Sequence, residues 1–182
     1  MLTARYRDAL ALAFDLHQPQ ARKGSGVPYV AHVLGVSSLV LEHGGDEDEA
    51  IAALLHDAVE DQGGAATLAR IAVAFGARVA EIVRGCSDSM GEPKPPWRER
   101  KEQYLAHLVS ASASVRLVSS CDKLYNARTI LADLRAGSPA WERFTGGRDG
   151  SLWYYGALAA ELAGTAVGDE LGRVVAELHA VG

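Results

Sequence analysis

The sequence lacks the features that define several large classes of protein. Its 182 residues include only two cysteines, Cys86 and Cys121, which excludes a disulfide scaffold, and there is no C-x-x-C pair to hold zinc or perform redox chemistry. No apolar run approaches the roughly 20 residues that span a bilayer. The N-terminal residues carry charges where a signal peptide is apolar. We therefore expect a cytoplasmic protein with no membrane partner.

The chain also lacks an excess of positive charge. Lysine and arginine number 18 against 23 aspartates and glutamates, so the net charge is −5. A molecule with this balance repels polyanions, and we expect no nucleic-acid partner. A small anionic ligand can still bind a local cluster of basic residues. With 48% hydrophobic residues, a chain of this length is expected to form one domain that buries about 70% of its unfolded surface.

Apolar residues recur at spacings of three and four, the period of amphipathic helices. This pattern predicts helices over Leu2–His17, Tyr29–His43 and 47–61, with Thr3 and Asp46 as N-terminal caps of the first and third. Later segments continue in the same way, and no segment alternates with period two between hairpin turns. The predicted fold class is therefore all-α, a bundle of about eight helices.

Two irregular stretches interrupt this pattern. Residues 18–28 contain two prolines and two glycines and place two cations, Arg22 and Lys23, in a loop. Residues 86–96 contain Gly91 and three prolines, and we expect a second, mobile loop there. Between them, Thr67 is expected to cap a short helix that ends near Gly76.

One cluster of ionisable residues follows an apolar run within residues 52–61. On a continuous helix with His56 at zero, Glu60 lies at about 40°, Asp57 at about 100° and Asp61 at about 140°. These four groups would share one side of the helix, and at least His56 and Asp57 should face the interior or a cleft. Burying them without partners is prohibitive, and a bound cation would resolve this by pairing with carboxylates and neutral imidazole.

A second cluster is a narrow polar stripe on an otherwise apolar helix. With Asp122 at zero, Asn126 lies at about 40° and Thr129 at about −20°. His32, on the first turn of the helix that follows the Arg22–Lys23 loop, is a third candidate. Both features are typical of a binding site.

The order of these residues resembles that of a known group of enzymes. A histidine that opens a helix, a His-Asp pair on a second helix and an aspartate on a later one form the pattern of HD-type metal-dependent phosphohydrolases. The flanking residues closely resemble the hydrolase domain of the RelA/SpoT alarmone enzymes, above all the stand-alone small alarmone hydrolases. The resembling segments are Ala21–His32 (ARKGSGVPYVAH), Ala53–Asp61 (ALLHDAVED), Phe75–Ala80 (FGARVA) and Asp122–Arg128 (DKLYNAR).

The resemblance covers about residues 5–163 of an expected single domain spanning 1–182. It implies that one divalent metal, expected to be Mn²⁺, binds His32, His56, Asp57 and Asp122. Two imidazoles and two carboxylates suit Mn²⁺ but also accept Zn²⁺ or Fe²⁺. The alternative is a buried polar cluster of core histidines and capping carboxylates that binds no metal.

The resemblance also implies roles around this metal. Glu60 and Asp61 would be the catalytic pair that orients or deprotonates the attacking water, although Asp61 could instead be a solvated helix end. Arg22, Lys23 and Ser25 lie in the loop that cradles the nucleotide in this family. The remaining substrate-binding residues implied are Asn126, Thr129 and Tyr154. The alternatives are a solvated surface turn for the loop and a core position for Tyr154.

The implied reaction is Mn²⁺-dependent hydrolysis of the 3′-pyrophosphate of (p)ppGpp to GDP or GTP and pyrophosphate. As a single domain without a synthetase, the chain is expected only to degrade its substrate. The chain departs from the long enzymes at two positions, with Ser119 in place of lysine and Gln62 in place of threonine, and we expect these residues to alter phosphate binding or the choice of substrate. The alternatives are a related nucleotide phosphohydrolase (ppApp hydrolase or NADPH 2′-phosphatase) and a non-catalytic nucleotide sensor. No feature predicts the oligomeric state.

Overall fold

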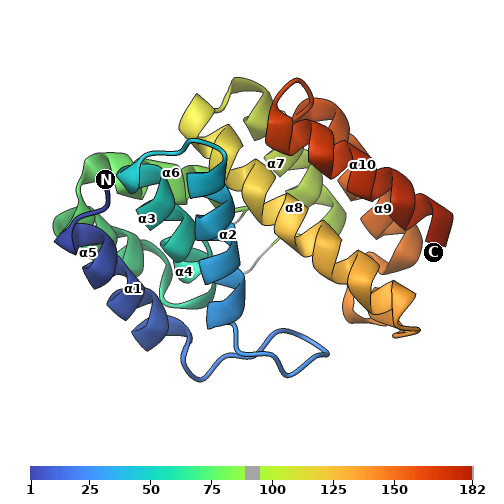
Figure 1. Ribbon diagram of the computed structural model, residues 1–182, viewed down its shortest axis with the longest axis horizontal. Coiled ribbons are helices and arrows are strands. Elements are labelled where there is room, and N and C mark those ends of the chain that lie inside the picture. The colour runs from blue at the N-terminus through green and yellow to red at the C-terminus, as the bar shows by residue number, and fades with distance from the viewer. Residues whose placement is uncertain (89–94, 182) are drawn as a thin grey trace. The chain divides into compact units, whose positions relative to one another are not determined.

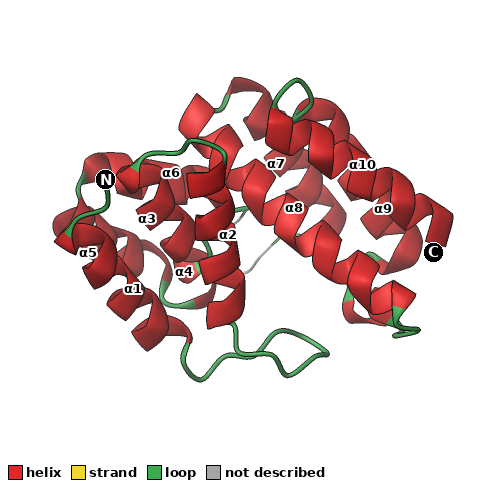
Figure 2. Ribbon diagram, viewed as in Figure 1, coloured by secondary structure: helices red, strands yellow, loops and turns green. Residues whose placement is uncertain are grey.

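The structure, a computed structural model, confirms the all-α class (Figure 2) and describes residues 1–88 and 95–181, except the side chain of Asp61. Most of the predicted 86–96 loop thus lies outside the described residues. The described residues form no strand and only one isolated bridge, between Ala21 and Pro28. Their helices are α1 Ala4–His17, α2 Val30–Glu42, α3 Glu47–Leu55, α4 Ala58–Asp61, α5 Gly64–Phe75, α6 Ala77–Cys86, α7 Trp97–Ser110, α8 Ala113–Arg135, the 3₁₀ helix η1 Ala140–Arg143, α9 Gly147–Glu161 and α10 Ala166–Val181.

The chain divides into two compact units, and the single domain expected from the sequence stays a prediction. The first unit comprises Met1–Lys94 and Ala111–Ser119. Its core lies where α2 packs on α3, and α1 and α6 also pack on α3 (Figure 1). Residues 50–55 of α3 are completely buried, as the apolar run in the sequence requires.

The second unit comprises Pro95–Ser110 and Ser120–Gly182. In it α9 packs against α7 and α10, and Leu158 of α9 and Leu171 of α10 are completely buried. Ion pairs from Arg128 to Glu170 and from Arg135 to Glu177 join α8 to α10. Within residues 1–88 and 95–181, no helix combines the length and the hydrophobicity that a membrane span needs.

Two of the three predicted caps are confirmed. Thr3 accepts a hydrogen bond from the backbone N–H of Arg5. Asp46 and Glu49 form a reciprocal capping box, with N–H to carboxylate distances of 3.0 and 2.8 Å. The cap predicted at Thr67 is wrong: α5 begins three residues earlier, and the Thr67 hydroxyl donates to the backbone carbonyl of Gln62.

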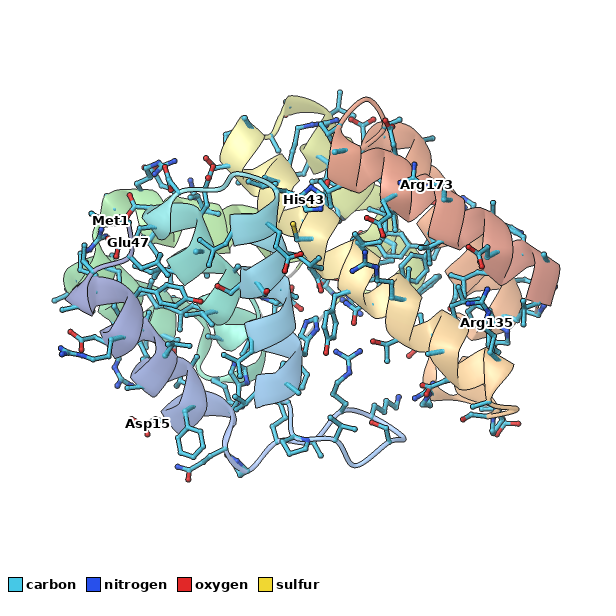
Figure 3. All side chains as sticks on the ribbon, viewed as in Figure 1. Met1, Asp15, His43, Glu47, Arg135 and Arg173 are labelled. Atoms are coloured by element: carbon cyan, nitrogen blue, oxygen red, sulfur yellow. The ribbon has the colours of Figure 1, made fainter. Side chains whose placement is uncertain are left out.

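The starts of α1 and α3 lie together in the first unit. Thr3 donates its backbone N–H to the carboxylate of Glu47, and Figure 3 shows Glu47 beside Met1. Arg5 forms an ion pair with Asp48 at 2.8 Å, and Arg78 of α6 forms one with Asp46 at 2.7 Å. These contacts fix the start of α3, the helix that leads into the candidate site.

Candidate active site

The predicted helix 47–61 is broken, which corrects the helical-wheel placement of its ionisable groups. Helix α3 ends at Leu55, His56 and Asp57 form a turn, and α4 begins at Ala58. His56 Nδ1 lies 2.8 Å from the carbonyl oxygen of Ala53, the acceptor that a continuous helix would offer to the N–H of Asp57. The imidazole therefore competes with the helix backbone, and the angles calculated for a continuous helix do not apply.

The turn brings three predicted metal ligands together in the first unit. One ligand atom each from His32, His56 and Asp57 lies within 4.8 Å of the other two. Asp57 Oδ2 is 3.4 Å from His32 Nε2 and 3.1 Å from His56 Nε2. Both imidazoles are buried, with exposures of 1% and 2%, while the Asp57 side chain is 24% exposed.

These residues fit a divalent metal ion. The hydrogen bond from His56 Nδ1–H to the Ala53 carbonyl leaves the Nε2 lone pair toward Asp57, the tautomer that a metal ligand needs. Two imidazole nitrogens and a carboxylate oxygen form a donor set that several divalent metals accept. The site could therefore hold a divalent metal, and its ligands leave the identity of the metal open.

The predicted catalytic pair lies on α4, directly after the turn. Glu60 is half-buried, and its Oε1 accepts a hydrogen bond of 2.5 Å from the backbone N–H of Asp88. This bond ties the carboxylate of α4 to the segment that follows α6. The backbone of Asp61 closes α4, but its side chain lies outside the described part of the structure.

The predicted nucleotide loop is closed at its base by backbone contacts. Ala21 and Pro28 form the isolated bridge, and the N–H of Tyr29 donates to the carbonyl of Gln20 at 2.9 Å. Arg22 N–H donates across the loop at 2.8 Å, to the carbonyl of Val27. The loop is therefore a folded turn and not an open linker.

Glycines allow this turn to form. Gly24 and Gly26 have φ angles of 81° and 70°, a left-handed conformation that a side chain disfavours. Lys23 and Ser25 lie exposed between and beside them, while Arg22 is half-buried. The loop thus presents two cations and a hydroxyl group, as the sequence predicted.

Asp122 and Asn126 of the polar stripe lie in the second unit, together with a lysine. Lys123 Nζ is 2.5 Å from Asp122 Oδ2, and Asn126 donates to Asp122 Oδ1 at 2.6 Å. Burial alone would lower the pKa of Lys123, but the charge of Asp122 and the Tyr154 and Tyr104 hydroxyl groups outweigh it and hold this pKa well above the ordinary value. Lys123 is therefore a permanent cation.

The second unit contains a cavity of about 220 Å³ next to this pair. Asn126 and Tyr154, two of the predicted substrate-binding residues, line it. Thr129 is not among its lining residues, and its hydroxyl donates to the carbonyl of Tyr125 at 2.9 Å. The other lining residues are Trp97, Lys101, Lys123, Phe144, Ser151 and Tyr155.

Two residues that contact predicted metal ligands, Tyr29 and Lys123, were not predicted from the sequence. The Tyr29 hydroxyl donates to Asp57 Oδ2 at 2.5 Å, and Lys123 pairs with Asp122 as described above. Both lie next to motif residues, Tyr29 within the PYVAH segment and Lys123 directly after Asp122. Their place beside motif residues was the one signal in the sequence that they contact the site. It was not sufficient, because an aromatic residue at a helix start and a lysine on a helix commonly have structural roles alone.

An all-helical fold that gathers a histidine from one helix and a His-Asp pair from the turn after another defines the HD-domain class. Residues 9–145 match the HD domain family, and the chain belongs to this family. It is similar to the guanosine-3′,5′-bis(diphosphate) 3′-pyrophosphohydrolase MESH1 of Danio rerio, with 37% identity over 131 residues, which cover 70% of each chain. The human protein of the same name is 35% identical over 130 residues, again 70% of each chain.

The longer relatives match over only part of their length. The bifunctional (p)ppGpp synthase/hydrolase SpoT of Escherichia coli is 33% identical over 132 residues, which are 69% of this chain and 18% of SpoT. Among solved structures, one described as a metazoan orthologue of SpoT that hydrolyses ppGpp superposes with a TM-score of 0.80 and 27% identity, covering 96% of this chain and 95% of that one. A Listeria monocytogenes protein superposes with a TM-score of 0.72 and 28% identity, covering 85% and 99%.

Proposed function

We propose that the protein hydrolyses the 3′-pyrophosphate of (p)ppGpp, releasing GDP or GTP and pyrophosphate. The observation that carries this proposal is the convergence of His32, His56 and Asp57 within 4.8 Å, one turn before the Glu-Asp pair of α4. We infer the substrate from the MESH1 relatives, which are named as guanosine-3′,5′-bis(diphosphate) 3′-pyrophosphohydrolases.

We propose Mn²⁺ as the resident metal, with Asp122 as a fourth ligand beside His32, His56 and Asp57. The support for Asp122 is its place in the ordered HD pattern. When bound, such a metal polarises a phosphate oxygen and lowers the pKa of a bound water. The two buried imidazoles exclude bulk water from one side of the site, and Asp57 contributes negative charge that favours a cation.

Glu60 and Asp61 handle the proton in this proposal. The oxygen of the attacking water forms a bond to the phosphorus that carries the ribose 3′ oxygen. The bond from this phosphorus to the 3′ oxygen breaks, and pyrophosphate is released. The Glu60 carboxylate takes one proton from the water, and this proton is passed to the 3′ oxygen, which leaves as the ribose 3′ hydroxyl group. The hydrogen bond from the Asp88 N–H at 2.5 Å orients Glu60 for this role.

The substrate is a polyanion, and basic residues in both units suit it. Arg22 and Lys23 are proposed to hold the nucleotide, with Ser25 as a hydrogen-bonding partner, because arginine stacks on purines and lysine neutralises phosphate. In the second unit, Asn126 and Tyr154 line a cavity that also contains Lys101. Thr129 stays a proposed contact.

The test is a nucleotide panel with Mn²⁺ that scores pyrophosphate against phosphate release. We expect pyrophosphate from ppGpp and pppGpp, loss of both activity and metal in His56→Ala, and loss of activity with the metal retained in Glu60→Ala. Phosphate release from NADPH, or cleavage of ppApp but not of ppGpp, would overturn (p)ppGpp as the substrate and identify NADPH or ppApp in its place. Tight ppGpp binding without turnover in metal-loaded protein would instead identify a sensor.

A further inference from the structure

Four aromatic rings form a row through the first unit, and only two of them belong to the HD motif. The centroid of His32 lies 5.2 Å from that of His56, Tyr29 lies 5.4 Å from His32, and His17 lies 5.0 Å from Tyr29. The row starts at two predicted metal ligands and ends at the last residue of α1. Neither His17 nor Tyr29 has a role in the proposed reaction.

Tyr29 contacts the metal site through its hydroxyl group, which donates to Asp57 Oδ2 at 2.5 Å. This is the same oxygen that faces the Nε2 atoms of His32 and His56 at 3.4 and 3.1 Å. A hydrogen bond to an ionised carboxylate is among the stronger ones in proteins. The bond therefore selects the rotamer of Asp57 that directs Oδ2 toward both imidazoles.

Tyr29 is itself held from behind. The imidazole of His17, which is completely buried, stacks on the Tyr29 ring with an angle of 30° between the planes. His17 Nδ1 donates to Gln20 Oε1 at 2.7 Å, while the backbone carbonyl of Gln20 accepts the Tyr29 N–H. Ring and backbone of Tyr29 are thus fixed by His17 and Gln20.

Gln62, one of the two departures from the pattern of the long enzymes, also joins this group. Its Nε2 donates to Gln20 Oε1 at 3.3 Å, the same oxygen that holds His17. Threonine, the residue of the long enzymes at this position, has a side chain two bonds shorter than that of glutamine. The end of the Glu-Asp segment is therefore connected to Asp57 through Gln20, His17 and Tyr29.

We propose that Tyr29 is a positioning residue of the metal centre and that His17, held by Gln20, keeps Tyr29 in place. The proposal rests on the proposed function in one respect, namely that a metal binds His32, His56 and Asp57. A residue that only fills the core would leave metal affinity unchanged when its hydroxyl is removed. A residue that orients a ligand would not, because partners behind metal ligands typically contribute about 10- to 100-fold in affinity.

The first test is Tyr29→Phe, which keeps the ring stacked on His17 and removes only the hydroxyl. We expect Mn²⁺ affinity, measured by the electron paramagnetic resonance signal of free Mn²⁺, to fall about tenfold or more. The visible spectrum of the Co²⁺-loaded variant should also change, since it reports ligand geometry. The matched control is Tyr6→Phe, which removes a hydroxyl bonded at 2.9 Å to Ser37 in the same unit.

The second test addresses His17. His17→Phe keeps a ring against Tyr29 but loses the bond to Gln20, and it should weaken Mn²⁺ binding by several-fold, less than Tyr29→Phe does. If His17 acts through the Tyr29 hydroxyl, the same substitution should add no further loss in a Tyr29→Phe background. This double-variant comparison separates positioning from general destabilisation.

Each outcome decides between the two proposals. Tyr29→Phe protein that binds Mn²⁺ as tightly as wild type and shows an unchanged Co²⁺ spectrum would overturn the positioning role and leave the proposed function intact. Fully additive losses in the double variant would overturn the role of His17. Wild-type protein that binds no Mn²⁺, or His56→Ala protein that binds it equally well, would overturn the metal centre and the positioning role together.

Discussion

Lys123 Nζ lies 2.5 Å from Asp122 Oδ2, so the aspartate that the HD pattern marks as a metal ligand already has a cationic partner in its own helix. Asn126 donates to the other carboxylate oxygen at 2.6 Å. Both members of the ion pair are largely buried, with side-chain exposures of 8% for Asp122 and 15% for Lys123. The pair orients Asp122 and holds the ammonium group of Lys123 at the cavity of the second unit.

Removing the cation should therefore destabilise the protein. Lys123→Met keeps the length of the side chain and leaves the Asp122 carboxylate buried without its partner, which typically costs about 3 kcal/mol or more. Urea unfolding of the metal-free protein measures this loss. Adding Asp122→Asn to the variant should recover most of it, because no buried charge is then left. A double variant as unstable as the sum of the single ones would contradict the pairing.

Trp97, which lines the cavity, lies so close to Gly146 that a larger residue at this position should not fit without a shift. A Cβ atom at Gly146 would lie 2.6 Å from Cη2 of Trp97, although the backbone φ of −76° suits any residue. Gly146→Ala should therefore displace the Trp97 ring, cost about 1–3 kcal/mol in unfolding experiments, and raise the KM for the nucleotide.

Gly156, within α9, is the matched control for Gly146, the residue directly before that helix, since a Cβ at Gly156 meets no atom within 4 Å. Gly156→Ala should leave KM unchanged and make the protein slightly more stable, by up to about 1 kcal/mol, because alanine favours helix. If both variants behaved alike, the position of Trp97 would not matter to the cavity.

The ionised carboxylate of Asp46, at the start of α3, should make the protein less stable at acidic pH. Burial slightly opposes ionisation of Asp46, but hydrogen bonds from the Glu49 N–H and from Arg78 outweigh it and lower the pKa of Asp46 below the ordinary 3.8. A group with a lowered pKa stabilises the fold above its ordinary value, and this contribution is lost as the pH falls through the folded value.

Arg78→Gln should therefore lower the melting temperature at pH 6, and its difference from wild type should shrink as the pH falls below about 4. Thermal denaturation followed by circular dichroism over this range measures the effect. Arg70→Gln, at an exposed position on α5, serves as the control and should follow the wild-type curve. A constant difference between Arg78→Gln and wild type at all pH values would exclude Asp46 as the acid-sensitive group.

Metal removal should lower the stability of the first unit. Dialysis against a chelator, followed by titration with Mn²⁺, should raise the free energy of unfolding by about 2.7 kcal/mol when the free metal reaches 100 times its Kd. Thermal shift assays measure the gain. His56→Ala protein should show little or none of it, and an equal gain in this variant would place the metal elsewhere.

Local sequence signals were enough for the fold class and for most helix starts. The Asp46 capping box is visible as an Asp followed three residues later by Glu, and the structure forms it. The cap predicted at Thr67 was wrong because an equally good helix start, at Gly63–Gly64, precedes it. The choice between the two starts depends on where Ile71 and Phe75 pack. Local capping preferences do not contain that information.

The candidate site was predictable only where its residues share a motif. His56 and Asp57 are adjacent in the sequence, yet the break between α3 and α4 was not visible because the apolar period continues through residues 47–61. The bond from Tyr29 to Asp57 joins residues 28 positions apart. Periodicity describes single helices, whereas this contact depends on how the loop before α2 returns to the turn after α3.

The number of residues in that loop is constrained by the contacts at its base. It leaves α1 at His17 and closes through the bridge between Ala21 and Pro28, and its last residue is Tyr29. An insertion or deletion between Arg22 and Val27 must leave the bridge between Ala21 and Pro28 in place. Otherwise Tyr29, whose hydroxyl group donates to Asp57, moves as well. Under the proposed function, the length of the loop from Arg22 to Val27 is constrained both by the contact of Tyr29 with Asp57 and by the nucleotide, and loops exchanged between relatives should function only when they preserve both ends.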